Sequence, residues 1–221
     1  MILVSQSYTA TSDKRNSELL KCRLHNEDSG LFDRVEYLDG RDRTLSFSEL
    51  LSHCVSKYRG QWCVISNSDI TFSSTAYMLR GMKREGRLVA LTRWEDFSGP
   101  RFVGFMSGDK FFSGTQDSWA FVAGSLPELQ VDIPLGVVGC DQLIAGWGVT
   151  SGLEVIDPAL SIRTTHLHSI EDRPEDRPAL SGFFGYPHLT TMNSSGEVLC
   201  HDWPNKDGEW EFDWQLYRYA R

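Results

Sequence analysis

The stretch CVISNSDITF, residues 63–72, decides the fold that the sequence predicts. Residues 63–65 are all apolar, as in a strand that is buried on both faces of a sheet. Residues 66–69 are polar, and the chain becomes apolar again directly after them. We therefore expect a core strand that ends near residue 66. Asp69 would then lie at the rim of the sheet, where a carboxylate either holds a metal ion or forms an ordinary turn.

Strand-like and helix-like segments alternate before this stretch. Strands are expected over residues 2–10 and 32–39, and helices over residues 12–27 and 46–60. With the strand that starts at residue 63, this is a β-α-β-α-β order, which predicts a parallel sheet with helices packed on its faces. Ligands of such sheets bind beyond the carboxyl ends of the strands. Three polar segments are expected at that edge: residues 5–8, 39–40 and 67–69.

Both expected helices carry start signals and apolar stripes. Ser12 or Asp13 is expected to cap the first helix, and Ser46 or Ser48 the second, which Gly60 would end. The apolar side chains expected to face the sheet are Leu19, Leu20, Cys22 and Leu24 in the first helix and Leu50, Leu51, Cys54, Val55 and Tyr58 in the second.

The rest of the chain is expected to add shorter elements, some of them antiparallel. We expect a short helix over residues 74–86, strands over 87–95 and 117–124, a loop or hairpin over 101–114, a helix from Cys140 or Asp141, and two short apolar runs over 153–169. The repeat EDRPEDRP, residues 171–178, predicts a loop, because its prolines and clustered acids exclude regular structure. The tail is expected to end in an edge strand or a docked arm. The predicted fold class is α/β, with a mixed, mainly parallel central sheet and helices on both faces.

Composition excludes several classes of protein. At 221 residues, with 40% hydrophobic and 24% charged residues, the chain suits one soluble globular domain. A formal net charge of -8 disfavours a nucleic-acid binder, because neutralising phosphates needs a basic surface. No apolar run approaches the roughly 20 residues of a membrane span, and the start lacks the pattern of a secretory signal. The five cysteines are scattered, which argues against a disulfide framework or a zinc site and favours a cytoplasmic location.

Two histidines far along the chain are candidate partners for Asp69. In TTHLHSI, His166 and His168 are two positions apart, so on a strand they would point to the same face. One imidazole joining Asp69 on Mn²⁺ or Mg²⁺ is chemically reasonable. The alternative is that both histidines end a strand and form local hydrogen bonds.

Other candidates follow strands or begin helices. Asp141 comes after a glycine-rich turn, a position that suits a helix cap and equally a general base for an incoming hydroxyl. Arg93 could neutralise a phosphate, and Trp94 and Trp119 could stack on a sugar ring. Gln116 and Asp117 could form hydrogen bonds with sugar hydroxyls. For each of these residues, a surface ion pair or a place in the core is the competing interpretation.

The order of these motifs resembles the GT-A (Rossmann-like) fold of nucleotide-sugar glycosyltransferases. It is most similar to the short glycosyltransferase domain found in large algal viruses and in related bacterial proteins. The stretches that carry the resemblance are VISNSDITF, LVALTRWE, GTQDSWAF, PLGVVGCDQLIAG and DPALSIRTTHLH, which span about residues 60–170. The first 60 residues agree in the order of strands and helices only, and the tail has no counterpart.

The resemblance implies one domain, residues 1–221, with a nucleotide-binding half (1–75), an acceptor and catalytic half (76–180) and an aromatic-rich C-terminal arm (181–221). GT-A enzymes usually carry an Asp-x-Asp triplet after the second helix. Here the triplet is Asn67-Ser68-Asp69, so only Asp69 carries over as a metal ligand.

The resemblance also implies roles for individual residues. A downstream histidine, His168 or His166, would complete the shell of Mn²⁺ or Mg²⁺, and Asp141 would be the base of an inverting transfer. The residues implied to bind the donor, a UDP-sugar, are Ser5, Gln6, Ser7, Tyr8, Asp39, Asn67, Ser68 and Arg93. The residues implied to bind the transferred sugar or the glycan or glycoprotein acceptor are Trp94, Gln116, Asp117 and Trp119.

Two rival functions remain open from the sequence. A nucleotidyltransferase is also α/β and also uses an acid-bound metal, but it usually has a glycine- and lysine-rich phosphate loop, and SQSYTATSDKR contains no glycine. A non-catalytic carbohydrate-binding module would suit the aromatic-rich second half. It would not suit the β-α-β-α-β beginning, because such modules are mostly β-sandwiches.

Overall fold

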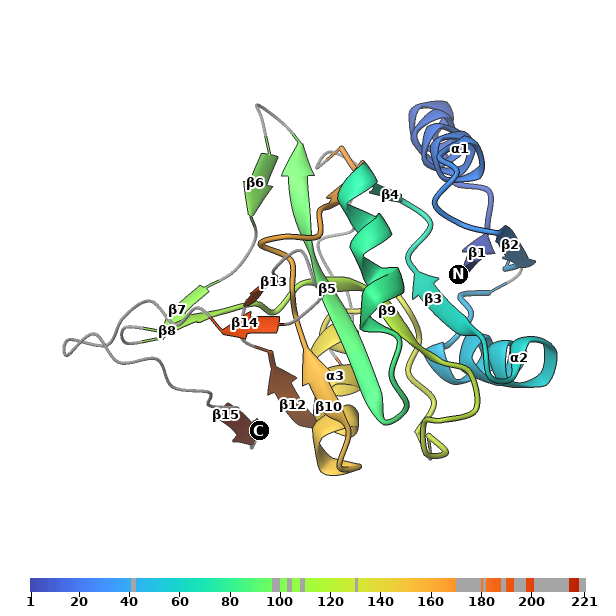
Figure 1. Cartoon of the computed structure of the whole chain (residues 1–221). Helices are drawn as coiled ribbons and strands as arrows, with labels where there is room; N and C mark the ends of the chain where they lie inside the picture. Colours follow the sequence, from blue (N-terminus) through green and yellow to red (C-terminus); the bar gives the residue numbers. More distant parts are fainter. Residues whose placement is uncertain are drawn as a thin grey trace.

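The chain begins with the β-α-β-α-β order that the sequence predicts (Figure 1). The elements are β1 (Ile2–Ser7), α1 (Asp13–Asp28), β2 (Arg34–Asp39), α2 (Phe47–Tyr58) and β3 (Trp62–Ser66). This computed structural model describes residues 1–40, 43–96, 100–102, 105–107, 110–129, 131–169, 180, 182–187, 190–192, 198–200 and 215–218. Ser12 caps α1. Ser46 caps α2 in a capping box with Glu49, in which each backbone N–H donates to the side chain of the other residue.

The carboxyl ends of the first three strands meet at one edge of the sheet. β1 pairs in parallel with both β2 and β3, and Ser7 lies opposite Asp39. The hydroxyl of Ser68, in the loop after β3, donates to the backbone oxygen of Gln6 at 2.6 Å. The expected meeting of the three polar segments at this edge is therefore confirmed.

The second half of the chain adds strands of both directions to this sheet. Its elements are β4 (Ile70–Phe72), the 3₁₀ helix η1 (Ser74–Met82), β5 (Arg87–Asp96), β6 (Pro100–Phe102), β9 (Gln116–Val122), α3 (Cys140–Thr150), β10 (Glu154–Ile156) and β11 (Thr164–His166). The strand order is β2-β1-β3-β9-β5-β11-β4, and β6 and β10 also pair with β5.

The sheet is mixed and strongly curled, and the expectation of a mainly parallel sheet is wrong. Four of its eight strand pairings are parallel and four are antiparallel. β9 runs antiparallel between β3 and β5. A parallel return would need a long crossover, usually a helix. The chain from β5 to β9 instead contains β6 and the hairpin of β7 (Phe105–Ser107) and β8 (Lys110–Phe112).

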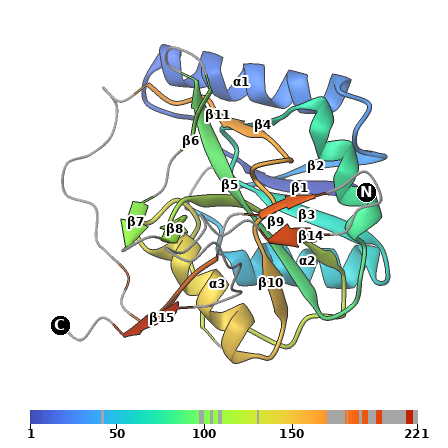
Figure 2. The ribbon, with the colours of Figure 1, turned by 60° about the vertical axis from the view of Figure 1, so that its left-hand side comes forward.

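Helices cover both faces of the sheet, as predicted (Figure 2). α2 and α3 lie on one face, where Phe47 and Ile144 pack into one core cluster with Trp119 of β9. α1 lies on the other face, where Leu79 of η1 and Phe72 of β4 belong to a second cluster. Of the helices in the described ranges, none has the length and apolar character needed to cross a membrane.

α1 packs against the sheet largely through polar contacts, and only Cys22 of its predicted apolar stripe is fully buried. Leu20 and Leu24 are 54% and 48% exposed, whereas Asn26 is buried. Nδ2 of Asn26 donates to the backbone oxygen of Ile70 at 2.8 Å, and its Oδ1 accepts from the N–H of Phe72 at 3.2 Å. Hydrogen bonds to β4 therefore fix this helix, and such bonds leave no trace in a hydrophobic pattern.

The C-terminal segment adds two small antiparallel pairs. β12 (Phe183–Tyr186) pairs with β15 (Gln215–Arg218), and β13 (Thr190–Met192) with β14 (Val198–Cys200). The backbone of β12 packs directly on α3, since a Cβ at Gly185 would lie 2.6 Å from the backbone nitrogen of Gly146. The repeat at residues 171–178 and the tail tryptophans Trp203, Trp210 and Trp214 lie outside the described residues.

Asp157, which follows β10, is a buried acid without a cationic partner among the described residues. Its carboxylate accepts hydrogen bonds from the N–H and the hydroxyl of Thr92, at 3.1 Å and 2.6 Å, and from the N–H of Ala159 at 3.3 Å. Burial outweighs these bonds and raises the pKa of Asp157 to about 7. The folded protein therefore holds a proton that the unfolded chain releases near pH 3.8.

We expect Asp157→Asn to remove a pH-dependent loss of stability. Asp157 contributes about 4 kcal/mol to the free energy of unfolding. This contribution is fully present below about pH 4 and is lost as the pH rises through about 7. Asn keeps the acceptor for two N–H groups and cannot ionise. Urea unfolding at about pH 5 and about pH 8 should show a fall for the wild type that the variant lacks. Asp28→Asn, at an exposed position, is the control, and parallel pH profiles for wild type and Asp157→Asn would contradict the expectation.

Candidate metal and ligand site

Backbone pairing brings two histidines to the turn that contains Asp69. This turn joins β3 to β4, and β11 pairs antiparallel to β4 with His166 opposite Ile70. Directly after β11, the N–H of Leu167 donates to the backbone oxygen of Asp69 at 2.8 Å. Two segments that lie 97 positions apart in the chain are therefore fixed against each other.

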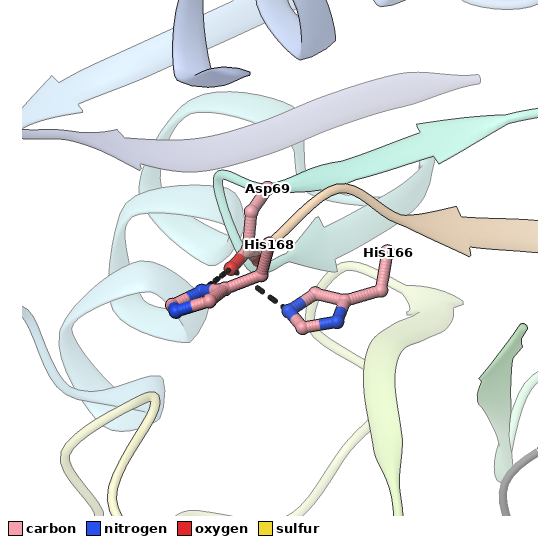
Figure 3. A group of neighbouring side chains, drawn as sticks. All are labelled: Asp69, His166 and His168. Atoms are coloured by element: carbon pink, nitrogen blue, oxygen red, sulfur yellow. Dashed lines mark hydrogen bonds and ion pairs between the residues drawn. The ribbon is translucent and has the colours of Figure 1, made fainter. Parts of the chain in front are cut away.

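The side chains of Asp69, His166 and His168 converge (Figure 3). Oδ2 of Asp69 lies 3.1 Å from Nε2 of His166 and 3.4 Å from Nδ1 of His168. The two imidazole rings are stacked, with centroids 5.3 Å apart. One ligand atom from each residue lies within 4.8 Å of the other two. The structure thus brings together the three residues that the sequence singled out, and the histidines do not simply form local hydrogen bonds.

Glu95, near the end of β5, orients the ring of His166. Its carboxylate oxygens lie 3.2 Å and 3.0 Å from Nδ1 of His166, which leaves Nε2 facing Asp69. Burial alone would lower the pKa of His166, but hydrogen bonds to Asp69 and Glu95 raise it to about 9. Carboxylates often support metal-binding histidines in this way. The sequence alone does not single out Glu95. Its one local signal is that it lies two positions after Arg93, so both side chains would point to the same face of a strand.

The three ligand atoms fit a divalent cation that accepts both nitrogen and oxygen. Two imidazoles and a carboxylate are a common ligand set for transition metals, whereas Mg²⁺ prefers oxygen ligands and water. Nε2 of His168 is buried and has no hydrogen-bond partner in the described part of the chain. Of the two expected cations, Mn²⁺ suits this cluster better than Mg²⁺, because two of the three ligand atoms are imidazole nitrogens.

Arg15 of α1 is a fourth member of the cluster, which the sequence alone does not single out. Its side chain is 6% exposed, and its Nη2 pairs with Oδ2 of Asp69. Burial alone would raise the pKa of Asp69, but the two histidines and Arg15 lower it well below its usual range. The pair spans 54 positions of the chain, so no local pattern could reveal it.

The cluster lies on the wall of a cavity of about 790 Å³ at the carboxyl ends of β1, β2 and β3. This volume is typical of small-molecule sites. Ten of the predicted site residues line it: Gln6, Tyr8, Asn67, Ser68, Asp69, Arg93, Asp117, Asp141, His166 and His168.

Asp141 reaches the cavity from the first turn of α3. The N-cap of α3 is Gly139, so the interpretation of Asp141 as the cap is wrong. Gly136 and Gly139 have positive φ angles of 73° and 91°, which glycine adopts without strain, and they shape the loop before the helix. Burial and the nearby charge of Asp117 raise the pKa of Asp141 well above its usual range, although Sγ of Cys140 donates to it at 3.1 Å. A raised pKa makes Asp141 a better proton acceptor.

Arg93 and Asp117 line the cavity as an ion pair. Nη1 of Arg93 lies 2.8 Å from Oδ2 of Asp117, and Nε of Arg93 lies 2.8 Å from Oε1 of Glu95. Nδ2 of Asn67 donates to the other carboxylate oxygen of Asp117. Arg93 is therefore neutralised by two carboxylates, and the amide of Asn67 is engaged with Asp117 rather than with the Asp69 cluster.

Six predicted binding residues do not line the cavity: Ser5, Ser7, Asp39, Trp94, Gln116 and Trp119. Trp119 is fully buried against Phe47, with ring centroids 5.4 Å apart, so it cannot stack on a sugar. Gln116 is also fully buried. Nε1 of Trp94 donates to the backbone oxygen of Ala159 at 3.0 Å, and Arg163 lies over its ring. These three side chains are therefore engaged within the fold and not at the cavity wall.

The residues at the ends of β1 and β2 also differ from the expectation. Ser5 is buried, and its hydroxyl donates to the backbone oxygen of Ser66 at 2.7 Å. Asp39 is exposed at the end of β2, and its neighbour Gly40 lines the cavity instead. A Cβ at Gly40 would lie 3.2 Å from Oε1 of Gln6, so the close approach of the two loops favours glycine there.

No known family model matches the chain, and no curated protein matches its sequence. The chemistry of the site therefore carries the functional argument.

We expect Glu95→Gln to lower the pKa of His166 from about 9 toward its ordinary 6.5, because the carboxylate behind Nδ1 loses its charge. The measurement is an NMR titration of the imidazole ring with a chelator present. The rings of His25, which contacts the backbone of Phe72, and His53, which contacts Glu36, serve as internal controls. A His166 titration that does not respond to the substitution would show that Glu95 does not support this ring.

Proposed function

We propose that the chain is a GT-A-type glycosyltransferase. It uses Mn²⁺ to move a sugar from a nucleoside diphosphate, with UDP as the expected nucleotide, to a hydroxyl of a glycan or glycoprotein, with inversion. One observation carries the proposal. A single cavity is lined by the cluster of Asp69, His166 and His168, by the loops after three parallel strands, and by Asp141 with its raised pKa.

The places of these residues in the fold support the proposal. In GT-A enzymes the metal-binding acid ends the strand after the second helix, and Asp69 follows β3, the strand after α2. A downstream histidine often completes the metal shell there, and His166 ends β11, with His168 two positions later. An acid that opens a late helix is the base of inverting members, and Asp141 lies in the first turn of α3.

The cavity offers distinct places for the parts of the donor. Gln6, Tyr8 and Gly40 line its wall at the ends of β1 and β2, where the resemblance puts the nucleoside. Asp69 and the two histidines lie next to these loops, where the diphosphate would reach a bound cation. That cation would offset the negative charge that grows on the diphosphate as its bond to the sugar breaks.

Asp141 supplies the proton chemistry of the proposal. As the acceptor hydroxyl attacks the anomeric carbon, its proton passes to the carboxylate of Asp141. The diphosphate leaves from the opposite face of the sugar ring, which inverts the configuration. A base works best when its pKa approaches the operating pH, and the raised pKa of Asp141 is in that direction.

Asp69→Ala should weaken Mn²⁺-dependent binding of UDP-sugars, because it removes the only carboxylate of the Asp69, His166 and His168 cluster. Losing the outer support of a metal ligand costs about 10–100-fold in affinity, so losing a ligand should cost at least that much. Calorimetric titrations of several UDP-sugars, with and without Mn²⁺, measure this effect directly.

Asp28→Ala, an exposed carboxylate at the end of α1, should bind donors like the wild type. Equal affinity of Asp69→Ala and wild type would contradict the proposed metal site. A carbohydrate-binding module should bind neither the nucleotide nor Mn²⁺ in these titrations. A nucleotidyltransferase should release pyrophosphate from a nucleoside triphosphate and a sugar phosphate.

Asp141→Asn should keep donor binding and lose transfer, because the amide cannot accept the proton. General base catalysis contributes about 10²–10⁴-fold, and the rate should fall by that factor. Released UDP, measured with an acceptor screen, gives the rate. Asp132→Asn, an exposed acid that does not line the cavity, is the matched control. Normal transfer by Asp141→Asn would mean that another group is the base.

A further inference from the structure

Arg15 is held at the cavity by contacts that do not depend on Asp69. Its Nη1 donates to the backbone oxygen of Leu167 at 2.7 Å and to Oε2 of Glu18 at 3.0 Å. Its Nη2 donates to the hydroxyl of Tyr8 at 3.3 Å and also pairs with Asp69. The guanidinium would therefore stay at this wall of the cavity if the carboxylate of Asp69 acquired another partner.

One oxygen atom of Asp69 serves several partners. Arg15, His166 and His168 all contact Oδ2 of this carboxylate. A cation that takes the same oxygen meets the positive charge of Arg15 within a few ångströms, and like charges at that distance repel strongly. Binding of a cation alone is therefore opposed by Arg15. A ligand that brings negative charge to the guanidinium would relieve this repulsion.

We propose that Arg15 is an anion-binding residue of this cavity: it neutralises Asp69 in the free protein and binds the diphosphate of the donor once a cation takes that carboxylate. The inference rests on the proposed function and adds a second role for one residue. Guanidinium groups match phosphate oxygens in charge and geometry, and the N–H of Nη2 that Asp69 occupies becomes available for them. Metal and diphosphate then bind as a pair rather than one after the other.

The other arginines that line the cavity are less suited to this role. Arg93 is held between Asp117 and Glu95, both of which would have to give up a short ion pair. Arg43 pairs with Glu49, and the side chain of Arg43 is 61% exposed. The carboxylate of Glu49 also accepts from the N–H of Ser46, the N-cap of α2. Arg15 is buried beside the metal ligands themselves, where a cation-bound diphosphate must lie.

Two affinities measured on Arg15→Gln test the inference. With Mn²⁺ alone, followed by electron paramagnetic resonance, the variant should bind at least about tenfold more tightly than the wild type, because the competing charge is gone. With UDP at saturating Mn²⁺, followed by calorimetry, it should bind at least about tenfold more weakly. A purely structural role would weaken both. Unchanged or weaker Mn²⁺ binding, or unchanged UDP binding, would overturn the inference.

Arg15→Lys keeps the test decisive if Arg15→Gln does not fold. Lys retains the charge but not the planar fork, so Mn²⁺ affinity should stay within about threefold of the wild type while UDP affinity falls. Arg23→Gln, at an exposed ion pair on the same helix, should change neither affinity. If the wild type binds neither Mn²⁺ nor UDP, the proposed function fails and the inference fails with it. If the wild type binds both ligands and the Arg15 variants match it, the inference alone fails.

Discussion

The carboxylate of Asp69 is the point on which the candidate site depends. Its side chain is only 13% exposed, in a turn at the rim of the sheet, and a largely buried charge is tolerated only when other groups compensate it. Here an arginine from α1 and two histidines from the end of β11 provide that compensation. The same turn accepts a backbone hydrogen bond from Leu167, so the contacts that position the ligands also close the sheet at β4 and β11.

The helix that carries Arg15 shows how fold and site share their contacts. α1 binds the edge strand β4 through Asn26, whose amide replaces the backbone partners that an edge strand lacks. The apolar residues Leu20 and Leu24 contribute little to this contact, because they are exposed. Hydrogen bonds are directional, so contacts of this kind fix the rotation of a helix about its axis more strictly than an apolar stripe does. That rotation matters here because Arg15 of the same helix must reach the carboxylate of Asp69.

The cavity is a balanced arrangement of charges rather than a basic pocket. Arg93 is neutralised by Glu95 and Asp117, and Arg15 is shared between Glu18 and Asp69. A negatively charged ligand therefore needs either an added cation or a rearrangement of these pairs. The acidic net charge of -8 is compatible with such a site, because the local pairing and not the total charge decides what the cavity attracts.

Local patterns in the sequence alone determined the first half of the fold and much of the candidate site. The buried run before Asp69, the serine caps of α1 and α2 and the parallel β-α order depend on neighbouring residues, and the structure contains all of them. The tertiary structure decided what long-range pairing controls. It made β9 antiparallel, buried Trp119, placed Glu95 behind His166 and brought Arg15 to Asp69. The last two of these contacts join residues 71 and 54 positions apart. The first two depend on which strands pair and on which face of a strand meets a helix. Hydrophobic periodicity carries no information about any of them.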